Sequence, residues 1–206
     1  IPWKLKKDGS TPQSGESISP YDVWIAEVML QQTQLKVVIP YWEKWMKTLP
    51  SLRYLAEAEE QDVLFLWQGL GYYSRAKRIH QASRLLIASV GKNRYLDPLS
   101  WPVGIDQWMK LPGIGRSTAG SIISSAFDLP APILDGNVKR IFSRLVASER
   151  TSNKDQKRLW KLSSLLLSTD KPRDFNQALM DLGSMVCKPK KPDCYLCPLK
   201  NYCIAY

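Results

Sequence analysis

The chain has 206 residues, 44% of them hydrophobic, so it can build a sizeable core without depending on disulfide bonds. Lysine and arginine outnumber aspartate and glutamate by 29 to 19, and the net charge of +10 is typical of proteins that neutralise phosphate groups. The sequence contains no apolar run long enough to span a bilayer and no export signal at its start, which predicts a soluble intracellular protein without membrane contact.

Apolar residues recur at helical spacing along almost the whole chain, and strand-like alternation is scarce, which predicts a nearly all-α protein. The first helix is expected to start after Ser19, with Pro20 at its first position, and to end before Pro40. The segment from Lys6 to Ser19 is rich in Gly, Ser and Pro and predicts an exposed loop. The expected helices are 20–38, 41–48, 51–58, 60–68, 74–90, 104–111, 116–127, 137–147, 154–168 and 173–186.

Glu27 lies within the almost continuous apolar segment VWIAEVMLQQT. If this helix is buried, desolvation raises the pKa of the carboxyl and keeps a proton on it near neutral pH, as a general acid requires. The alternative is an acid at a helix edge with a partner of its own, which is the commoner situation for a single glutamate.

Residues 104–127 read GIDQWMKLPGIGRSTAGSIISSAF and predict two helices joined by a tight turn. Pro112 ends the first helix, and Gly113 and Gly115 permit positive φ and expose backbone N–H groups at the start of the second. Such a helix–hairpin–helix turn suits a phosphate oxygen and positions a duplex without reading its sequence. On the pattern alone, a purely structural turn explains these glycines about as well.

Residues 128–132, DLPAP, interrupt the helical pattern and predict a boundary between two lobes with a cleft at it. Asp135 follows in PILDGNVKRIFSRLV, directly before a helix with one apolar face. The positive end of that helix favours the anion, so Asp135 is either a helix cap or an ionised partner for Glu27. One protonated and one ionised carboxyl at a cleft is the arrangement that breaks glycosidic bonds.

All four cysteines lie in the basic tail CKPKKPDCYLCPLKNYC, with the spacing C-x6-C-x2-C-x5-C. Disulfides are not expected in an intracellular chain with a good core. Structural zinc usually takes two separated short-spaced pairs, whereas an iron–sulfur cluster accepts mixed spacings. From spacing alone both metal sites stay open. The candidate ligands are Cys187, Cys194, Cys197 and Cys203.

A set of segments carries a further signal: WIAEVMLQQT, GLGYYSRAKRIH, LPGIGRSTAG, PILDGNVKR, FNQALMDLGSMVC and the four-cysteine tail. In this order, and over almost the whole chain, they resemble the catalytic domain of the MutY family of adenine DNA glycosylases, within the endonuclease III-like helix–hairpin–helix superfamily. The resemblance implies a six-helix barrel lobe over residues 20–130, with the hairpin at about 104–127. It implies an iron–sulfur cluster lobe formed by residues 1–19 and 131–206, and a DNA-binding cleft between the lobes. The family continues into a MutT-like domain, which is expected to be absent here.

The resemblance also implies residue roles. Glu27 would protonate a flipped adenine, and Asp135 would stabilise the sugar cation left behind. The four cysteines would hold a [4Fe-4S] cluster. Further implied positions are the duplex wedge at Gln32 and Tyr72, DNA contacts at Gly113, Gly115, Arg116, Ser117 and Lys139, and an adenine pocket lined by Trp3 and Lys4.

The resemblance implies a monofunctional enzyme of base excision repair that hydrolyses the N-glycosidic bond of adenine mispaired with 8-oxoguanine or guanine. Ser117 replaces the lysine of bifunctional relatives and cannot form an imine, so no efficient strand scission is expected. The expected partner is mispaired double-stranded DNA, bound by a monomer in the bacterial cytoplasm or nucleoid, or else in a nucleus or organelle. The alternatives are a same-fold glycosylase for another base, a non-catalytic DNA-damage binder and a small electron carrier.

Overall fold

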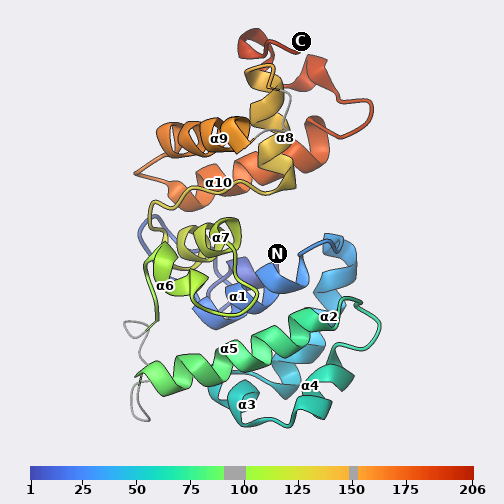
Figure 1. Ribbon diagram of the computed structural model, residues 1–206, viewed down its shortest axis with the longest axis vertical. Helices are drawn as coiled ribbons and strands as arrows, with labels where there is room; N and C mark the ends of the chain where they lie inside the picture. Colours follow the sequence, from blue (N-terminus) through green and yellow to red (C-terminus); the bar gives the residue numbers. More distant parts are fainter. Residues whose placement is uncertain (91–100, 149–152) are drawn as a thin grey trace.

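The computed structural model describes residues 1–90, 101–148 and 153–206, and within these ranges every regular element is a helix, as the sequence predicts (Figure 1). None of the helices in the described ranges is both long and apolar enough to cross a membrane. The helices form a first lobe that contains the N-terminus and a second lobe that ends at the C-terminus (Figure 1).

In its described residues, the first lobe holds a short 3-10 helix, η1, and seven α-helices. They are η1 (Pro2–Lys4), α1 (Pro20–Met29), α2 (Leu35–Thr48), α3 (Leu52–Glu57), α4 (Glu60–Leu66), α5 (Ser74–Val90), α6 (Ile105–Met109) and α7 (Arg116–Phe127). The described part of the second lobe holds three α-helices, a π-helical turn, η3, and two 3-10 turns. They are α8 (Gly136–Leu145), α9 (Asn153–Leu166), α10 (Pro172–Asp181), η3 (Leu182–Val186), η4 (Cys194–Leu196) and η5 (Lys200–Tyr202).

Helix α1 lies at the centre of the first lobe, and eight of its ten residues are buried. It packs against α2, α5 and α7, which explains why its sequence is apolar on every side. The Trp24 ring packs against the stacked rings of Trp101 and Trp108, at centroid distances of 6.4 and 6.0 Å. A central, covered helix is therefore the element that carries Glu27.

The second lobe has a smaller core, built on the apolar face of α8 that the sequence predicts. Val138, Ile141 and Phe142 point into it and meet Leu159 of α9 and Leu179 of α10. This core fixes the direction of α8, and with it the position of Asp135 directly before the helix.

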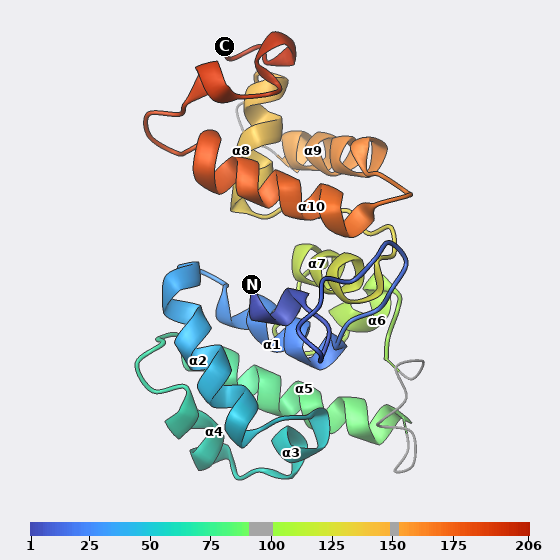
Figure 2. The ribbon, with the colours of Figure 1, turned by 180° about the vertical axis from the view of Figure 1, so that it is seen from behind.

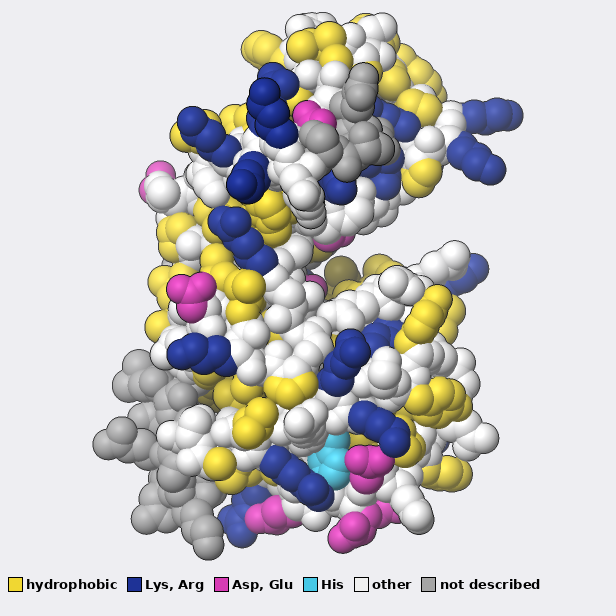
Figure 3. Space-filling model, in the orientation of Figure 1, with side chains coloured by type: hydrophobic (Ala, Val, Ile, Leu, Met, Phe, Trp, Pro, Cys, Tyr) yellow, Lys and Arg dark blue, Asp and Glu magenta, His cyan; other side chains and the backbone are white. Residues whose placement is uncertain are grey.

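Helices α7 and α10 join the two lobes, and Figure 2 shows them side by side. The Asn176 side chain donates to the Ser124 hydroxyl and to the Ala131 carbonyl, both at 2.9 Å. The Arg173 guanidinium donates to the Ser125 carbonyl at 2.7 Å. Because these partners are buried, the bonds hold the lobes at a defined separation, and a hollow remains between them (Figure 3).

The N-terminal stretch, which the resemblance assigns to the second lobe, contacts both lobes. Trp3 and Ile18 are part of the first core. Ser14 donates to the Asp170 carbonyl at 3.0 Å, and Arg173 donates to the Glu16 carbonyl, so the same stretch is tied to the second lobe. The expected barrel range, 20–130, includes residues 91–100, which lie outside the described residues.

The expected first helix, 20–38, is wrong, because the chain leaves the helix after Met29 and restarts at Leu35. Gln32 has a φ of 58°, which an α-helix cannot contain. The expected stop at Pro40 is also wrong, since α2 runs through it. Pro40 lies in the second turn of α2, where the ring removes a single backbone hydrogen bond and the rest of the helix compensates.

Candidate active site

A cavity of about 710 Å³ lies between the lobes, in the hollow that Figure 3 shows. Both lobes and the connection between them contribute to its walls. The residues that line it include Trp3, Lys4, Glu27, Gln31, Ser117, Thr118, Ser121, Asp135, Asn137, Asp181 and Ser184. Glu27 and Asp135, which are 108 positions apart by their numbering (135 − 27), therefore face one space.

Glu27 points into this cavity from the last turns of α1, and its side chain is only 12% exposed. Burial raises the pKa of the carboxyl, and the nearby negative charge of Asp135 acts in the same direction. The ammonium of Lys4 lies 3.9 Å from Glu27 Oε1 and opposes this rise. Glu27 is thus a shielded carboxyl that holds its proton to a higher pH than an exposed glutamate does.

Lys4 ends the 3-10 turn η1 and is itself largely covered. Its ammonium donates to the Ser125 hydroxyl of α7. Burial lowers the pKa of Lys4, although the charge of Glu27 partly restores it. Trp3 beside it is 2% exposed and packs against Trp42, with ring centroids 5.5 Å apart. The long loop before α1 therefore still delivers both residues to the cavity.

Asp135 is the N-cap of α8, and its carboxylate accepts a hydrogen bond from the Val138 N–H at 2.8 Å. The N–H groups of Asn137 and Val138 and the charge of Arg140 favour the anion, as the sequence predicts. Burial outweighs them, however, and the pKa of Asp135 is raised overall. Asp135 is both the helix cap and a cavity-facing carboxyl, so the two interpretations of the sequence are not exclusive.

Ser117 lies in the first turn of α7, and its hydroxyl accepts a hydrogen bond from the Leu134 N–H at 3.0 Å. Ser121 faces the same cavity one helical turn later, and Asn137 does so two residues after Asp135. Sequence reasoning did not single out Ser121 or Asn137. The i, i+4 spacing of the two serines is the signal that could have identified Ser121.

The hairpin turn exposes the N-terminus of α7 beside the cavity. Gly113 has a φ of 82°, and a Cβ there would lie 3.1 Å from the Arg78 side chain, so glycine is required. The expectation of a positive φ at Gly115 is wrong. Gly115 has a φ of −90°, because as N-cap of α7 it needs only extended backbone. The Arg116 guanidinium lies 4.1 Å from the ring centroid of Trp160 on α9.

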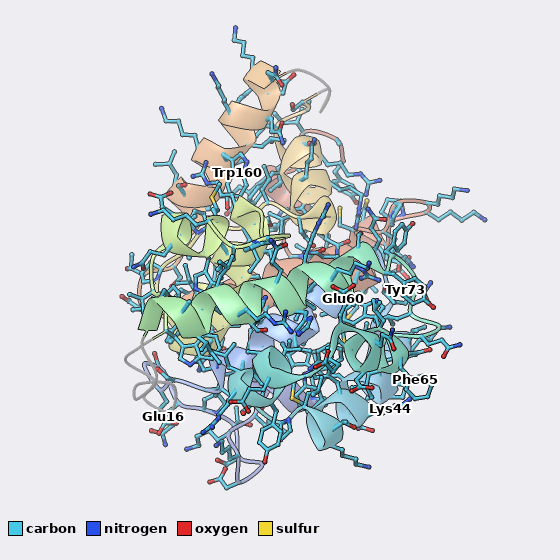
Figure 4. The ribbon with its side chains drawn as sticks, turned by 60° about the horizontal axis from the view of Figure 1, so that its bottom comes forward. Glu16, Lys44, Glu60, Phe65, Tyr73 and Trp160 are labelled. Atoms are coloured by element: carbon cyan, nitrogen blue, oxygen red, sulfur yellow. The ribbon has the colours of Figure 1, made fainter. Side chains whose placement is uncertain are left out.

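The expected wedge residues lie outside the cavity lining, in two turns of the first lobe. Gln32 has a φ of 58° and Tyr72 a φ of 49°, and Tyr72 is 62% exposed. The neighbouring Tyr73 is 45% exposed and lies beside the start of α5 (Figure 4). Lys139 lies on α8 and does not line the cavity.

The four cysteines are free thiols of intermediate exposure at the far end of the second lobe. Arg144 donates to Cys187 Sγ at 3.2 Å, and Arg140 donates to the Cys187 carbonyl at 2.8 Å. In the described part of the chain, no group of three or more His, Cys, Asp or Glu side chains is placed to hold a metal ion. Four thiols are suitable ligands for zinc or for an iron–sulfur cluster, and a hydrogen bond to sulfur such as that of Arg144 would tune either site. The cluster stays a prediction.

Comparison with known proteins adds the family. The family model described as "HhH-GPD superfamily base excision DNA repair protein" matches residues 25–164. The chain is 40% identical, over its whole length, to 55% of a protein of Buchnera aphidicola subsp. Schizaphis graminum named "Adenine DNA glycosylase". It spans about half the length of the curated relatives it matches.

Two solved structures share the fold. A thermostable thymine-DNA glycosylase has a TM-score of 0.82 at 24% identity, covering 100% of this chain and 88% of that one. Endonuclease III in a non-covalent DNA complex has a TM-score of 0.77 at 22% identity, covering 94% of this chain and 87% of that one. These likenesses establish the endonuclease III-like fold that the sequence predicts.

Proposed function

The chain belongs to the HhH-GPD superfamily of base excision DNA repair proteins, and on that premise we propose that it is a monofunctional adenine DNA glycosylase. Its substrate is adenine mispaired with guanine or 8-oxoguanine in double-stranded DNA. The observation that carries the proposal is the shared cavity of Glu27 and Asp135, two carboxyls whose pKa values are both raised by burial but whose hydrogen-bond and charge partners differ. The name of the 40% identical relative supports the choice of adenine.

In the proposed reaction, Glu27 transfers its proton to a ring nitrogen of the extruded adenine. The bond between that base and the sugar C1′ then breaks, and its electron pair leaves with the base. Neutral adenine is a poor leaving group, so a carboxyl that keeps its proton near neutral pH is what this step requires. The raised pKa of Glu27 supports this role.

Asp135 faces the positive charge that develops on the sugar as the bond breaks. Its carboxylate is held in place by the α8 N-terminus through the Val138 N–H at 2.8 Å, so it stabilises the cation without rearranging. A water molecule then adds to C1′ and gives up a proton to the Glu27 carboxylate, which completes hydrolysis and restores the acid. The anion of Asp135 is favoured by the backbone N–H groups of Val138 and Asn137, whereas at Glu27 the Lys4 charge is the main group that favours the anion.

Strand scission needs an amine that attacks the sugar carbon. The side chain at position 117 is a serine and provides no amine. The Ser117 hydroxyl is occupied by the Leu134 N–H at 3.0 Å and cannot form an imine in any case. The free product is therefore an intact strand with an abasic sugar, which breaks only when alkali is added.

The proposed DNA contacts are the exposed N-terminus of α7 for a phosphate and the turns of Gln32 and Tyr72 for the duplex itself. The net charge of +10 supports a polyanionic partner. The chain also shares its fold with endonuclease III, which was solved in complex with DNA. Steep weakening of duplex binding with added salt is expected.

We also propose that the four cysteines bind a [4Fe-4S] cluster, which would supply a rigid scaffold for the C-terminal loop. The ligands would be Cys187, Cys194, Cys197 and Cys203, and Arg144 would donate to the sulfur of the first. A brown protein with a broad visible absorption band and about four irons per chain is expected; bound zinc with no such band would contradict it.

The proposed function is tested by single-turnover release of adenine from duplexes with adenine opposite guanine, 8-oxoguanine or thymine, with and without alkali. Release from the two mispairs, visible as breaks only after alkali, supports the proposal. A parallel duplex with thymine opposite guanine tests the alternative base. Glu27→Gln should bind the mispaired duplex but lose about 100- to 10,000-fold in rate. Binding without release by the unaltered chain would instead indicate a non-catalytic damage binder.

A further inference from the structure

Arg75, the second residue of α5, is buried, with 6% of its surface exposed, although arginine is almost never covered without a specific set of partners. Its guanidinium donates to acceptors in two separate segments of the chain. In the first segment the acceptors are the carbonyls of Val28, Met29 and Gln31 and the Thr33 hydroxyl; in the second they are the carbonyls of Leu70 and Gly71.

The first segment is the end of α1 and the turn that follows it. Helix ends leave carbonyls without intrahelical partners, and Arg75 donates to that of Met29 at 2.9 Å. It also donates at 3.0 Å to the Val28 carbonyl, which accepts from the Gln31 N–H as well. It also donates to the Thr33 hydroxyl at 3.2 Å, so it holds both sides of Gln32. On the other side of this turn, the Gln31 amide donates to Thr118 at 3.3 Å, which ties the turn to α7.

The second segment is the turn before α5. Arg75 donates to the carbonyls of Leu70 and Gly71 at 3.3 and 3.2 Å, directly before Tyr72. The guanidinium carbon also lies 5.4 Å from the Tyr72 ring centroid and 5.2 Å from that of Trp67. The cation is thus packed between an anchored ring and the ring of the exposed tyrosine.

Gln32 and Tyr72 share an unusual backbone, with φ values of 58° and 49°. Non-glycine residues persist in this region only when the surroundings over-determine them, and such residues cluster at functional sites. One planar cation with donors on both sides provides that constraint for both residues at once. A lysine ammonium has neither the fork nor the reach to do so.

We propose that Arg75 is a positioning residue that sets Gln32 and Tyr72 as one rigid unit for entry into the duplex, and so determines how efficiently the target nucleotide is extruded. The inference rests on the proposed function. It assigns Arg75 no contact with the base or the sugar.

The test is Arg75→Lys, which keeps the charge, with Arg84→Lys as the matched control. Arg84 lies on the same helix and donates in a similar way to the carbonyls of Ala56 and Ala58, at 3.2 and 3.3 Å, but far along α5 from both turns. Extrusion is followed by the fluorescence of 2-aminopurine at the target position of a mispaired duplex. The Glu27→Gln background prevents cleavage, so the readout does not depend on catalysis.

Arg75→Lys should slow extrusion by about 10- to 100-fold, while Arg84→Lys stays within about twofold of the parent. The decisive variant removes both wedge side chains, Gln32→Ala with Tyr72→Ala. In that background Arg75→Lys should have no further effect, because residues that act as one unit are not additive. An equal loss with and without the wedge side chains, or no loss at all, would overturn the inference.

If circular dichroism shows that Arg75→Lys does not fold, Thr33→Val is used instead, because it removes one acceptor of the guanidinium. Its effect on extrusion is then compared with and without the Gln32 and Tyr72 side chains in the same way. Adenine release by the unaltered chain is measured beside it. If adenine is released but the effect of Arg75→Lys adds to that of Gln32→Ala with Tyr72→Ala, only the positioning role is refuted. If neither adenine release nor extrusion is observed, the proposed function is refuted, and this inference with it.

Discussion

Replacing Lys4 with methionine isolates the electrostatic control of the candidate general acid. Lys4 Nζ lies 3.9 Å from Glu27 Oε1, and both side chains are largely covered. At an effective dielectric constant of about 20, two unit charges at about 4 Å interact by roughly 4 kcal/mol. That is an upper bound, because burial lowers the pKa of Lys4 and solvent reaches both groups in part. Because this attraction favours the Glu27 anion, we expect the pKa of Glu27 to rise further in Lys4→Met.

The sign of the effect on rate follows from the role of the acid. Glu27 works only when protonated, so the rate of base release falls as pH rises through its pKa, and Lys4→Met should move this alkaline limb to higher pH. The assay is single-turnover adenine release between about pH 5 and 9, with enzyme in excess. The control is Lys6→Met, which removes an exposed pair with Glu16 in the same segment. An alkaline limb that stays in place or moves to lower pH in Lys4→Met would show that Glu27 is not the acid.

Four other variants have defined outcomes. Asp135→Asn should unfold at nearly the same temperature as the parent, since asparagine is an equally good N-cap, yet release adenine about 100- to 1,000-fold more slowly. Asp135→Ala should lose about 1 kcal/mol of stability as well, measured by urea unfolding. Arg116→Ala removes the contact with the Trp160 ring and a charge at the hairpin, so duplex affinity should fall for every sequence alike and its salt dependence should become shallower, as read by fluorescence anisotropy. Gly113→Ala should weaken binding further, because a positive φ and the Arg78 side chain both oppose a Cβ there; unchanged affinity would contradict the hairpin contact.

Helix positions could be predicted where the signals are local. The Ser19 cap and Pro20 start α1 as expected, and the Ser19 hydroxyl accepts from the Asp22 N–H. Helices α5 and α7 have the predicted bounds. The break after Met29 could not be predicted, because the group that satisfies the freed carbonyls is Arg75, which is 46 positions later (75 − 29). No property of the local sequence distinguishes that turn from continued helix.

The features of the candidate site can also be separated into those set by the local sequence and those set by tertiary packing. The sequence by itself determined which residues have the chemistry: a carboxyl in an apolar helix, an aspartate before an amphipathic helix, glycines in a hairpin and thiols in a basic tail. Only the tertiary structure decided that Glu27 and Asp135 face one cavity, that burial outweighs the helix end at Asp135, and that one arginine holds the turns of Gln32 and Tyr72. The reason is physical. Residue type and helical periodicity are local properties of the chain, whereas desolvation and hydrogen bonds between distant segments exist only after the lobes have packed together.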